Sequence, residues 1–564
     1  MSLSPSAHVD TFTRDNLPPV DQWPDLVFDL PELQYADRLN CAEELLGGSI
    51  ARFGPHRPCL RDASGTVWSY GEVRDRVDKI AQVLADDLGI LPGNRVLLRG
   101  PNNPELVACW LAVLKVGAVV VTTMPLLRAG ELATIGRIAR VQLALCDSRL
   151  TDDLIKADVP GMKIVEYGGE TGDLARAAAA KDGSYQTVQT AADDVALLAF
   201  TSGTTGRPKS TMHFHRDVLA IADTFSAHVL KPQPDDLFTG SPPLAFTFGL
   251  GGLVIFPMRV GAASLLLEKA PPPDLFAAVA DHKVTVLFTA PMAYRAALTM
   301  LPGVDVSSLR RCVSAGEALP KSTWEAFHDA TGVRIIDGIG ATEMLHIFVG
   351  SADDDIRPGS TGRPVPGYRA QVLDESGNPA PAGTLGRLAV KGPTGCRYLS
   401  DDRQLAYVQN GWNITGDTYT RDADGYFWYQ ARSDDLIIAS GYNISPAEVE
   451  ETLLRHPDVA ECGVVGLPDE RGSLAVTPSS FCGEGPPAAS QRSRRCRSSR
   501  RPRSRRTSAR GRSALSPSCP GPTLASCSAS ASASPPANAR ATARAPRQGG
   551  MKRPPLTSRT TPVM

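Results

Sequence analysis

From about Glu43 to residue 336 the chain alternates between two spacings of apolar positions, one typical of helices and the other of strands. Tyr70–Leu88 has the spacing of an amphipathic helix that ends at Gly89 and Pro92. Short apolar runs typical of buried strands recur between such helices, at 95–98, 117–122, 141–146, 163–165, 196–200, 262–267, 284–288 and 334–336. Strands and helices that alternate through short loops predict parallel sheets covered by helices, and therefore an α/β fold.

The pattern changes twice towards the C-terminus. Residues 362–429 carry short strand patterns separated by turn sequences such as SGNP, PAGT and DADG, which predict a small β-rich subdomain. A third pattern follows Asp434, with strands at 436–438 and 460–465 around a helix at 446–454. We therefore expect a large domain over 1–432, a partial small α+β domain over 433–472 and a separate tail over 473–564.

Composition and charge separate the tail from the body. The chain has 564 residues, of which 42% are hydrophobic and 21% charged, and this excludes a wholly disordered or fibrous protein. Its net charge of −1 is the sum of −17 over 1–472, from 42 basic and 59 acidic residues, and +16 over 473–564, from 17 basic residues and Glu484. The tail is rich in Arg, Ser, Pro and Ala, so we expect it to be disordered, without a specific nucleic-acid partner.

The chain shows no sign of a membrane anchor, a secretory signal or a disulfide framework. Its longest apolar stretches, 108–121 and 244–258, fall short of the roughly 20 residues that a spanning helix needs. Seven cysteines lie dispersed in the body without a CxxC pair, as expected for reduced thiols. These features favour a cytoplasmic protein without a membrane partner, and we expect a monomer or a homodimer.

A Gly-, Ser- and Thr-rich string directly follows the strand at 196–200 and reads TSGTTGRPKS over 201–210. Backbone N–H groups and hydroxyls in such a turn can surround phosphate oxygens, and Lys209 adds a cation. The string is not a Walker A loop, because Arg207 and Pro208 separate its last glycine from the lysine. It predicts a phosphate-binding loop, and an ordinary surface loop is the alternative.

Five ordered motifs resemble those of the adenylate-forming superfamily, which contains acyl-CoA synthetases, peptide-synthetase adenylation domains and luciferases. They are the string at 201–210, SAGE over 314–317, DGIGATE over 337–343, WNITGD over 412–417 and RSDDLIIASGYN over 432–443. The resemblance covers roughly residues 20–472. It implies a large domain with two helix-covered, mainly parallel sheets, a small C-terminal domain, and activation of a carboxylic acid as its adenylate with ATP and Mg²⁺.

The resemblance also implies roles for individual residues. Asp434 would be the hinge on which the small domain rotates, and Gly441 would lie near the path of coenzyme A. The catalytic residues would be Thr201, Lys209, Thr342 and Glu343, with Glu343 as the Mg²⁺ ligand. The nucleotide-binding residues would be Ser202, Gly203, Thr204, Thr205, Gly206, Gly316, Glu317, Asp337, Gly338, Asp417 and Arg432, of which Asp417 and Arg432 would contact the ribose.

Three further strings resemble aromatic acid:CoA ligases, especially those for 2-aminobenzoate and benzoate. They are PPLAFTFGLG over 242–251, MLHIF over 344–348 and GPTGCRY over 392–398. Aromatic walls with intervening glycines suit a flat ring that enters edgewise, although ordinary core packing is an alternative for the two phenylalanines and the histidine. The resemblance implies that the acyl pocket contains Phe246, Phe248, Gly249, Gly340 and His346, and it does not separate benzoate from 2-aminobenzoate by residue chemistry.

The tail has the features of a shifted reading frame. When GC-rich codons are assumed and read from the third base, residues 477–484 give AFVVLRG and residues 519–533 give PRTxTGKLQRFRLR. The second string resembles the catalytic-lysine motif near the C-terminus of the superfamily. The single lysine of the tail, Lys552, matches no such motif. We therefore expect a chain without the catalytic lysine and without much of the small domain.

Together these features predict an ATP-dependent aryl acid:CoA ligase, which forms an aryl-AMP and then the aryl-CoA thioester. Its partners would be an aromatic carboxylate, with 2-aminobenzoate favoured, together with ATP and coenzyme A, and its activity would be impaired by the missing lysine. Two alternatives remain. One is an acid-adenylating enzyme with another acceptor, such as a carrier protein, and the other is a non-catalytic remnant that binds nucleotide or aryl acid.

Overall fold

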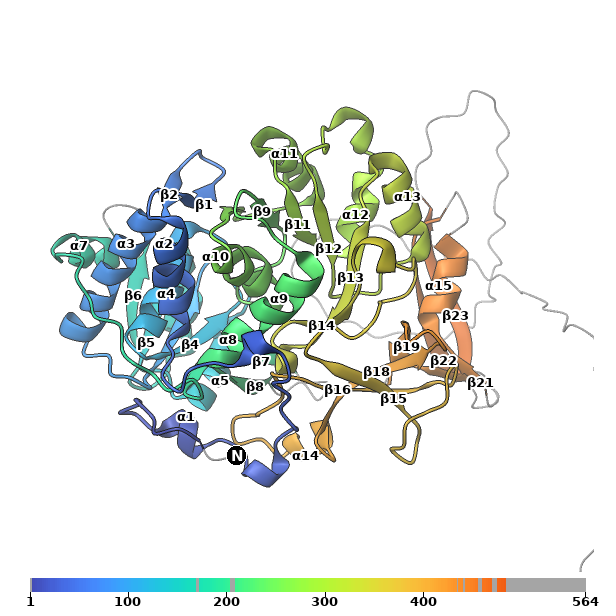
Figure 1. The fold of residues 1–564 in the computed structure, drawn as a ribbon, viewed down its shortest axis with the longest axis horizontal. Helices are drawn as coiled ribbons and strands as arrows, with labels where there is room; N and C mark the ends of the chain where they lie inside the picture. The colour runs from blue at the N-terminus through green and yellow to red at the C-terminus, as the bar shows by residue number, and fades with distance from the viewer. Residues whose placement is uncertain are drawn as a thin grey trace, which may run out of the picture. The chain divides into compact units, whose positions relative to one another are not determined.

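The computed structural model describes residues 3–168, 172–202, 208–433, 435–439, 442–454, 459–468 and 474–482. These residues form two mainly parallel sheets covered by helices, together with a β-rich subdomain (Figure 1). The predicted α/β fold is thus confirmed. The part of the tail after 482, for which we predict disorder, lies outside the described residues.

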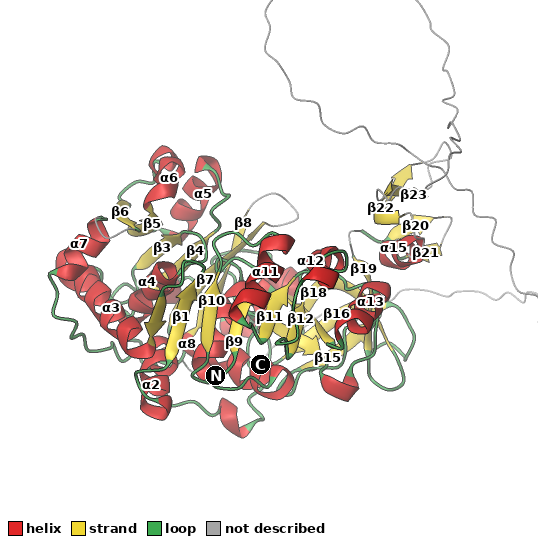
Figure 2. Cartoon of the chain, turned by 90° about the horizontal axis from the view of Figure 1, so that it is seen from above, coloured by secondary structure: helices red, strands yellow, loops and turns green. Residues whose placement is uncertain are grey.

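The first sheet consists, in spatial order, of β6 (Lys163–Tyr167), β5 (Leu143–Asp147), β3 (Arg95–Arg99), β4 (Val119–Thr123), β7 (Val195–Ser202) and β8 (Pro208–Phe214). All neighbours are parallel except β7 and β8. Helices α3 (Tyr70–Gln82), α4 (Pro104–Lys115) and α7 (Asp173–Ala179) cover one face, and α5 (Ala129–Ala139) and α6 (Thr151–Ala157) cover the other, as Figure 2 shows for α3, α5 and α6.

Strand β3 illustrates how the sequence directs this layering. Successive side chains of a strand point to opposite faces. Val96 and Leu98 accordingly pack in the core that contains α3 and α4, whereas Leu97 packs in the core that contains α5 and α6. A strand that is buried on both faces therefore reads as a continuous apolar run, which is the pattern that predicted it.

The second sheet consists, in spatial order, of β14 (Ile347–Gly350), β13 (Ile335–Gly340), β12 (Arg311–Ser314), β11 (Val286–Thr289), β9 (Leu237–Gly240), β10 (Ala263–Leu266), β1 (Pro58–Asp62) and β2 (Val67–Ser69). One face packs against α11 (Pro272–His282), α12 (Pro291–Ala297) and α13 (Lys321–Thr331). The other face packs against α8 (His215–Ile221), η6 (Ala222–Leu230), η7 (Gly251–Ile255) and α10 (Phe256–Arg259). These four segments share one core with α3 and α4, so a common layer of helices lies between the two sheets.

Local capping explains where two of the central helices begin. Ser69 precedes α3 and accepts a hydrogen bond from the backbone N–H of Glu72, whose carboxylate accepts one from the backbone N–H of Ser69. Asn103 precedes α4 and accepts from the backbone N–H of Leu106, with Pro104 in the first turn. Helix α4 is almost completely buried, as its position between the layers requires.

The β-rich subdomain and the shorter helices complete the large domain. The subdomain sheet contains β15 (Arg369–Leu373), β16 (Gly386–Lys391), β18 (Trp412–Arg421), β17 (Val408–Gln409) and β19 (Phe427–Arg432), all antiparallel to their neighbours, next to α14 (Gln404–Tyr407). The remaining short helices are α1 (Phe12–Asp15), α2 (Gly48–Phe53) and α9 (Thr247–Leu250).

The C-terminal part extends beyond the boundary that we expected. Helix α15 (Pro446–Leu454) has the predicted bounds, and β20 (Ile437–Ala439) pairs with β21 (Tyr442–Ile444). Strand β22 (Val459–Pro468) pairs along its length with β23 (Leu474–Cys482) in antiparallel register. Since β23 lies in the segment assigned to the tail, the boundary at 472 is wrong and the small domain continues through this strand.

Two expectations about the body can be compared directly with the structure. The seven cysteines outside the tail are free thiols, and all but Cys462 are buried. Within the described ranges, no helix combines the length and the apolar composition that crossing a membrane would require.

Arg397 and Asp217 form an ion pair in the core. Both side chains are fully buried, and Arg397 Nη2 donates to Asp217 Oδ2. The Arg397 guanidinium also lies 4.0 Å from the ring centroid of Phe214. Backbone hydrogen bonds of 2.8 Å from Met212 N to Arg397 O and 2.9 Å from Leu399 N to Ser210 O join the two segments. Residues 397–399 therefore run beside β8 like an added strand.

Removing one partner of this pair should destabilise the fold strongly, because it leaves an uncompensated charge in the core. We expect Asp217→Asn or Arg397→Met to lower the free energy of unfolding by about 3–5 kcal/mol. Arg369→Met, which removes an arginine from the exposed pair with Asp29, is the matched control and should change it little. Urea unfolding followed by tryptophan fluorescence measures the three variants, and equal losses would contradict the prediction.

Candidate active site

A cavity of about 510 Å³ lies where the carboxyl ends of β12 and β13 meet β18, β19 and α15. Its size suits a nucleotide-sized ligand. Seven predicted site residues line it, and these are Gly316, Glu317, Asp337, Gly338, Gly340, Asp417 and Arg432. Tyr419, Trp428 and Tyr429 also line it, and the sequence analysis did not single them out. Residues from four separate motifs thus converge on one space.

Asp417 and Arg432 lie opposite each other on the antiparallel strands β18 and β19. Arg432 Nη1 is 3.4 Å from Asp417 Oδ1. Burial raises the pKa of the Asp417 carboxyl, and the positive charge of Arg432 acts in the opposite direction. The pair offers a carboxylate acceptor and guanidinium donors at the cavity wall, which suits a group with neighbouring hydroxyls such as a ribose.

Asp337 lies within β13, at the first residue of that strand that lines the cavity. Its Oδ1 is buried and has no hydrogen-bond partner in the part of the chain that the structure describes. Burial raises the pKa of this carboxyl to about 8. Near neutral pH the side chain is therefore mainly protonated, and it can donate a hydrogen bond as well as accept one.

Glu343, the predicted Mg²⁺ ligand, is buried in the short 3-10 helix η9 (Thr342–Met344). Lys209 Nζ lies 2.8 Å from Glu343 Oε1. The hydroxyl of Tyr398 donates to the same oxygen, and Lys209 donates to that hydroxyl. Tyr398 belongs to a string that we associated with the aryl site, and no local sequence pattern indicates its contact with the Glu343 carboxylate.

The donor set around Glu343 fits a magnesium ion that accompanies a nucleotide. The described residues contain no group of three or more His, Cys, Asp or Glu side chains that could enclose a metal. A single hard carboxylate suits Mg²⁺, because this ion commonly binds through one or two carboxylates and completes its shell with waters and phosphate oxygens.

Strands β7 and β8 flank the predicted phosphate loop. Thr201 pairs with Lys209 in antiparallel register, and Thr201 Oγ1 is buried without a partner among the residues described. His213 on β8 donates from Nε2 to the carbonyl oxygen of Thr342 at 2.8 Å, so η9 lies beside this hairpin. The predicted residues Gly203, Thr204, Thr205, Gly206, Asp434 and Gly441 lie outside the described residues, as does the side chain of Ser202.

His346 lies at the centre of an aromatic cluster. Its side chain is 2% exposed, and the rings of Phe225, Phe248, Phe256 and Phe288 have centroids 4.5–6.4 Å from that of the imidazole. Burial lowers the pKa of His346 to about 3, so the ring is neutral. Neither ring nitrogen has a hydrogen-bond partner among the described residues. The neutral ring therefore offers one N–H donor and one lone pair to a group that enters the cluster.

Two glycines allow the chain to approach His346 closely. A Cβ on Gly251 would lie 2.3 Å from His346 Cδ2, and a Cβ on Gly340 would lie 2.8 Å from the His346 carbonyl carbon. Gly340 also lines the large cavity. The cavity therefore borders the backbone of His346 at this glycine, and a larger residue there would displace that backbone.

The structure separates the two phenylalanines that we assigned to the acyl pocket. Phe248 packs 5.7 Å from His346 and 5.4 Å from Phe288, between ring centroids. Phe246 precedes α9 in an extended backbone conformation and is 47% exposed. Gly249 supports this turn, because a Cβ there would lie 2.2 Å from the carbonyl oxygen of Pro243.

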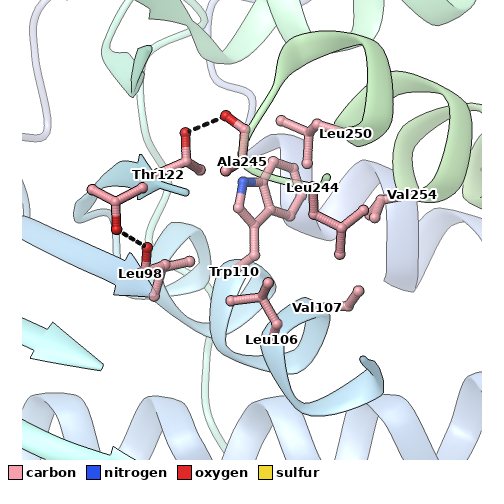
Figure 3. Close-up of a pocket in the computed structure, with 10 residues that line it drawn as sticks. Leu98, Leu106, Val107, Trp110, Thr122, Leu244, Ala245, Leu250 and Val254 are labelled. Carbon is pink, nitrogen blue, oxygen red and sulfur yellow. Dashed lines mark hydrogen bonds between the residues drawn. The ribbon is translucent and has the colours of Figure 1, made fainter. Parts of the chain in front are cut away.

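A second, much smaller cavity lies between β3, β4, α4 and the segment around α9 (Figure 3). Its volume of about 10 Å³ is close to the space of one water molecule. The hydroxyl of Thr122 at its edge donates to Ala245 O at 3.0 Å, and the rest of its lining is largely apolar, with Trp110 at its centre. This cavity is too small for an aryl acid or a nucleotide.

Models of two protein families match the chain, and the first match contains Lys209, Asp337 and Glu343. The model described as AMP-binding enzyme matches residues 49–398, and the model described as AMP-binding enzyme C-terminal domain matches residues 448–478. The chain belongs to the AMP-binding enzyme family. The second match ends inside β23, which agrees with the continuation of the small domain beyond 472.

Individual relatives are similar over most of their length. Benzoate–CoA ligase of Thauera aromatica is 31% identical over 450 residues, which cover 78% of this chain and 85% of the relative. The solved anthranilate CoA ligase AuaEII in complex with anthranoyl-AMP has a TM-score of 0.76 and 32% identity, covering 82% and 90% of the two chains. ATP-bound MatB from Rhodopseudomonas palustris has a TM-score of 0.73 and 27% identity, covering 79% and 89%. The chain therefore stands in the adenylate-forming superfamily, near the aryl-CoA ligases.

The raised pKa of Asp337 predicts a dependence of stability on pH. A carboxyl whose pKa is about 8 in the folded state and about 4 when unfolded binds its proton more tightly in the folded state. It therefore lowers stability as the pH rises from about 4 to about 8. Asp337→Asn should remove this loss, so its melting temperature relative to the unaltered chain should increase across that range. Asp152→Asn controls for the loss of an exposed carboxylate, and parallel melting profiles for all three proteins would contradict the prediction.

Proposed function

We propose that this protein is an ATP-dependent aryl acid:CoA ligase. One observation carries the proposal: the nucleotide-sized cavity with the Asp417–Arg432 pair reaches Gly340, which lies against the backbone of His346. The neutral ring of His346 lies in the aromatic cluster. An aryl carboxylate in the cluster would then lie next to the phosphates of a nucleotide in the cavity. The names of the relatives, which include a benzoate–CoA ligase and an anthranilate CoA ligase, support this substrate class.

The proposed reaction has two steps. A carboxylate oxygen of the acid attacks the α-phosphorus of ATP, which gives aryl-AMP and releases pyrophosphate. The sulfur of coenzyme A then attacks the carbonyl carbon, and AMP leaves as the thioester forms. The first step brings two anions together, so its transition state needs cations and hydrogen-bond donors that are already in place.

The residues of the site would divide this work. Thr201 and Lys209 on the β7–β8 hairpin would contact phosphate oxygens, and Asp417 with Arg432 would bind the ribose. Glu343 would hold Mg²⁺, which supplies additional positive charge at the phosphates when it is bound. Of these residues, Asp417 and Arg432 line the cavity, and Lys209 pairs with Glu343 beside the hairpin.

We favour 2-aminobenzoate as the acid. The neutral His346 presents a lone pair that can accept a hydrogen bond from an amino group on the ring, and the apolar walls around it favour a flat, uncharged ring. The similarity to the anthranilate CoA ligase structure supports this choice, since anthranilate is 2-aminobenzoate.

Acid binding to the full chain tests the substrate class. Calorimetry should show that 2-aminobenzoate and benzoate bind at least about tenfold tighter than a medium-chain fatty acid, because the aromatic walls fit a flat ring. His346→Phe keeps an aromatic ring but removes both nitrogens, so it should remove the preference for 2-aminobenzoate over benzoate. Tighter binding of the fatty acid would refute the aryl assignment.

We also propose that the missing C-terminal lysine slows adenylation in this chain. The only lysine after residue 472 is Lys552, which stands in the sequence GGMKRP and matches no lysine motif of the superfamily. A binding protein without turnover is the extreme form of this proposal. Transfer to a carrier protein is the other alternative, and release of a thioester with free coenzyme A distinguishes it from the ligase.

Restoring the reading frame tests the role of the lysine. Pyrophosphate release measures the rate of adenylation. This rate should be at least about 10² lower in the unaltered chain than after a one- or two-base correction near the codons for residues 471–477. Replacing the recovered lysine with alanine should again abolish this step and spare much of the thioester formation from supplied aryl-AMP. A normal rate in the unaltered chain would show that another cation, such as Lys209, fills the role.

A further inference from the structure

Lys209 is held in a defined position away from solvent. Its Nζ lies 2.8 Å from Glu343 Oε1 and donates to the hydroxyl of Tyr398. The ring centroids of Tyr398 and Tyr407 lie 4.5 Å and 5.3 Å from the same nitrogen. A carboxylate, a hydroxyl and two aromatic faces therefore surround the ammonium group, and aromatic faces attract such a cation.

The ammonium group of Lys209 compensates the negative charge of the Glu343 carboxylate. Its side chain is 8% exposed, and Lys209 is its only ion-pair partner among the residues that the structure describes. A buried carboxylate without a counter-charge is costly. The same carboxylate is the one that the proposed function assigns to Mg²⁺, so one acidic group has two candidate cations.

We propose that Lys209 and the Mg²⁺ that accompanies ATP use the Glu343 carboxylate alternately. Two cations within about 4 Å of each other repel strongly in a partly buried site, so the metal and the ammonium group exclude each other. Lys209 neutralises Glu343 until the metal binds, and it is then released towards the phosphates, next to Thr201 on the paired strand. Lys209 thus acts as an internal substitute for the metal.

Tyr398 would keep the carboxylate in place during this exchange. The Tyr398 hydroxyl donates to Glu343 Oε1, and this hydrogen bond uses neither Lys209 nor the metal, so it can persist in both states. The inference rests on the assignment of Glu343 to Mg²⁺ in the proposed function.

The exchange of Lys209 for the metal at Glu343 is tested by titrating the full chain with Mn²⁺ alone. Electron paramagnetic resonance measures the bound Mn²⁺. Lys209→Met removes the competing charge and should bind Mn²⁺ at least about tenfold tighter than the unaltered chain. Lys209→Arg keeps the charge and should bind it as the unaltered chain does. Lys283→Met, which removes a lysine from the exposed pair with Asp305, controls for net charge and should also leave the affinity unchanged.

Nucleotide binding should respond in the opposite direction. Lys209→Met should bind MgATP at least about tenfold more weakly, because the phosphates lose a cation that the metal alone does not replace. Tighter metal binding combined with weaker nucleotide binding is not expected from a merely structural lysine. Unchanged, weaker or undetectable binding of Mn²⁺ to Lys209→Met overturns the inference.

Glu343→Gln distinguishes failure of the inference from failure of the metal assignment. Adding Glu343→Gln to Lys209→Met should abolish the tightened Mn²⁺ binding. If Mn²⁺ still binds tightly, the metal does not use Glu343, and both the inference and that assignment are wrong. If Glu343→Gln alone weakens binding of Mn²⁺ with ATP but Lys209→Met fails to tighten binding of the free ion, only the inference is wrong.

Discussion

The buried ion pair between Arg397 and Asp217 determines how the parts of the site meet. Each charge is tolerated in the core only because the other lies against it, so the pair permits little variation in geometry. It holds residues 397–399 beside β8, and Tyr398 thereby reaches Glu343 and Lys209. One contact between distant parts of the sequence thus brings the hydroxyl donor Tyr398 to the carboxylate and its cation.

The sequence predicted the groups that act on the nucleotide better than those that surround the acid. Motifs for the nucleotide keep their chemistry within a few consecutive residues, and strand pairing then brings Asp417 and Arg432 together. Phe225 and Phe288 come from separate elements and have the pattern of ordinary core positions. The packing of the helix layer against the second sheet places these two rings around His346. The spacing of residues along the chain does not predict this arrangement.

The misplaced boundary at 472 has a similar cause. The average composition of the tail is that of a disordered segment. The few apolar residues of β23 are too few to change this average. An antiparallel neighbour needs no crossover connection, so a short segment can extend an existing strand. In β23, residues 475–477 pair with residues 465–467 of β22. The formation of β23 therefore depends on the partner strand β22 as much as on the sequence of β23 itself.

Burial acts on the two halves of the site in opposite ways. In the cavity and near the predicted aryl position it favours uncharged forms, since it raises the pKa of Asp337 and lowers that of His346. Near the phosphates it is compensated instead, since Glu343 keeps a cation within 2.8 Å. The proposed reaction brings a carboxylate and a phosphate together, so an ionised Asp337 carboxylate nearby would add negative charge where negative charge is already the obstacle. Neutral hydrogen-bonding groups there can recognise the acid without that electrostatic cost.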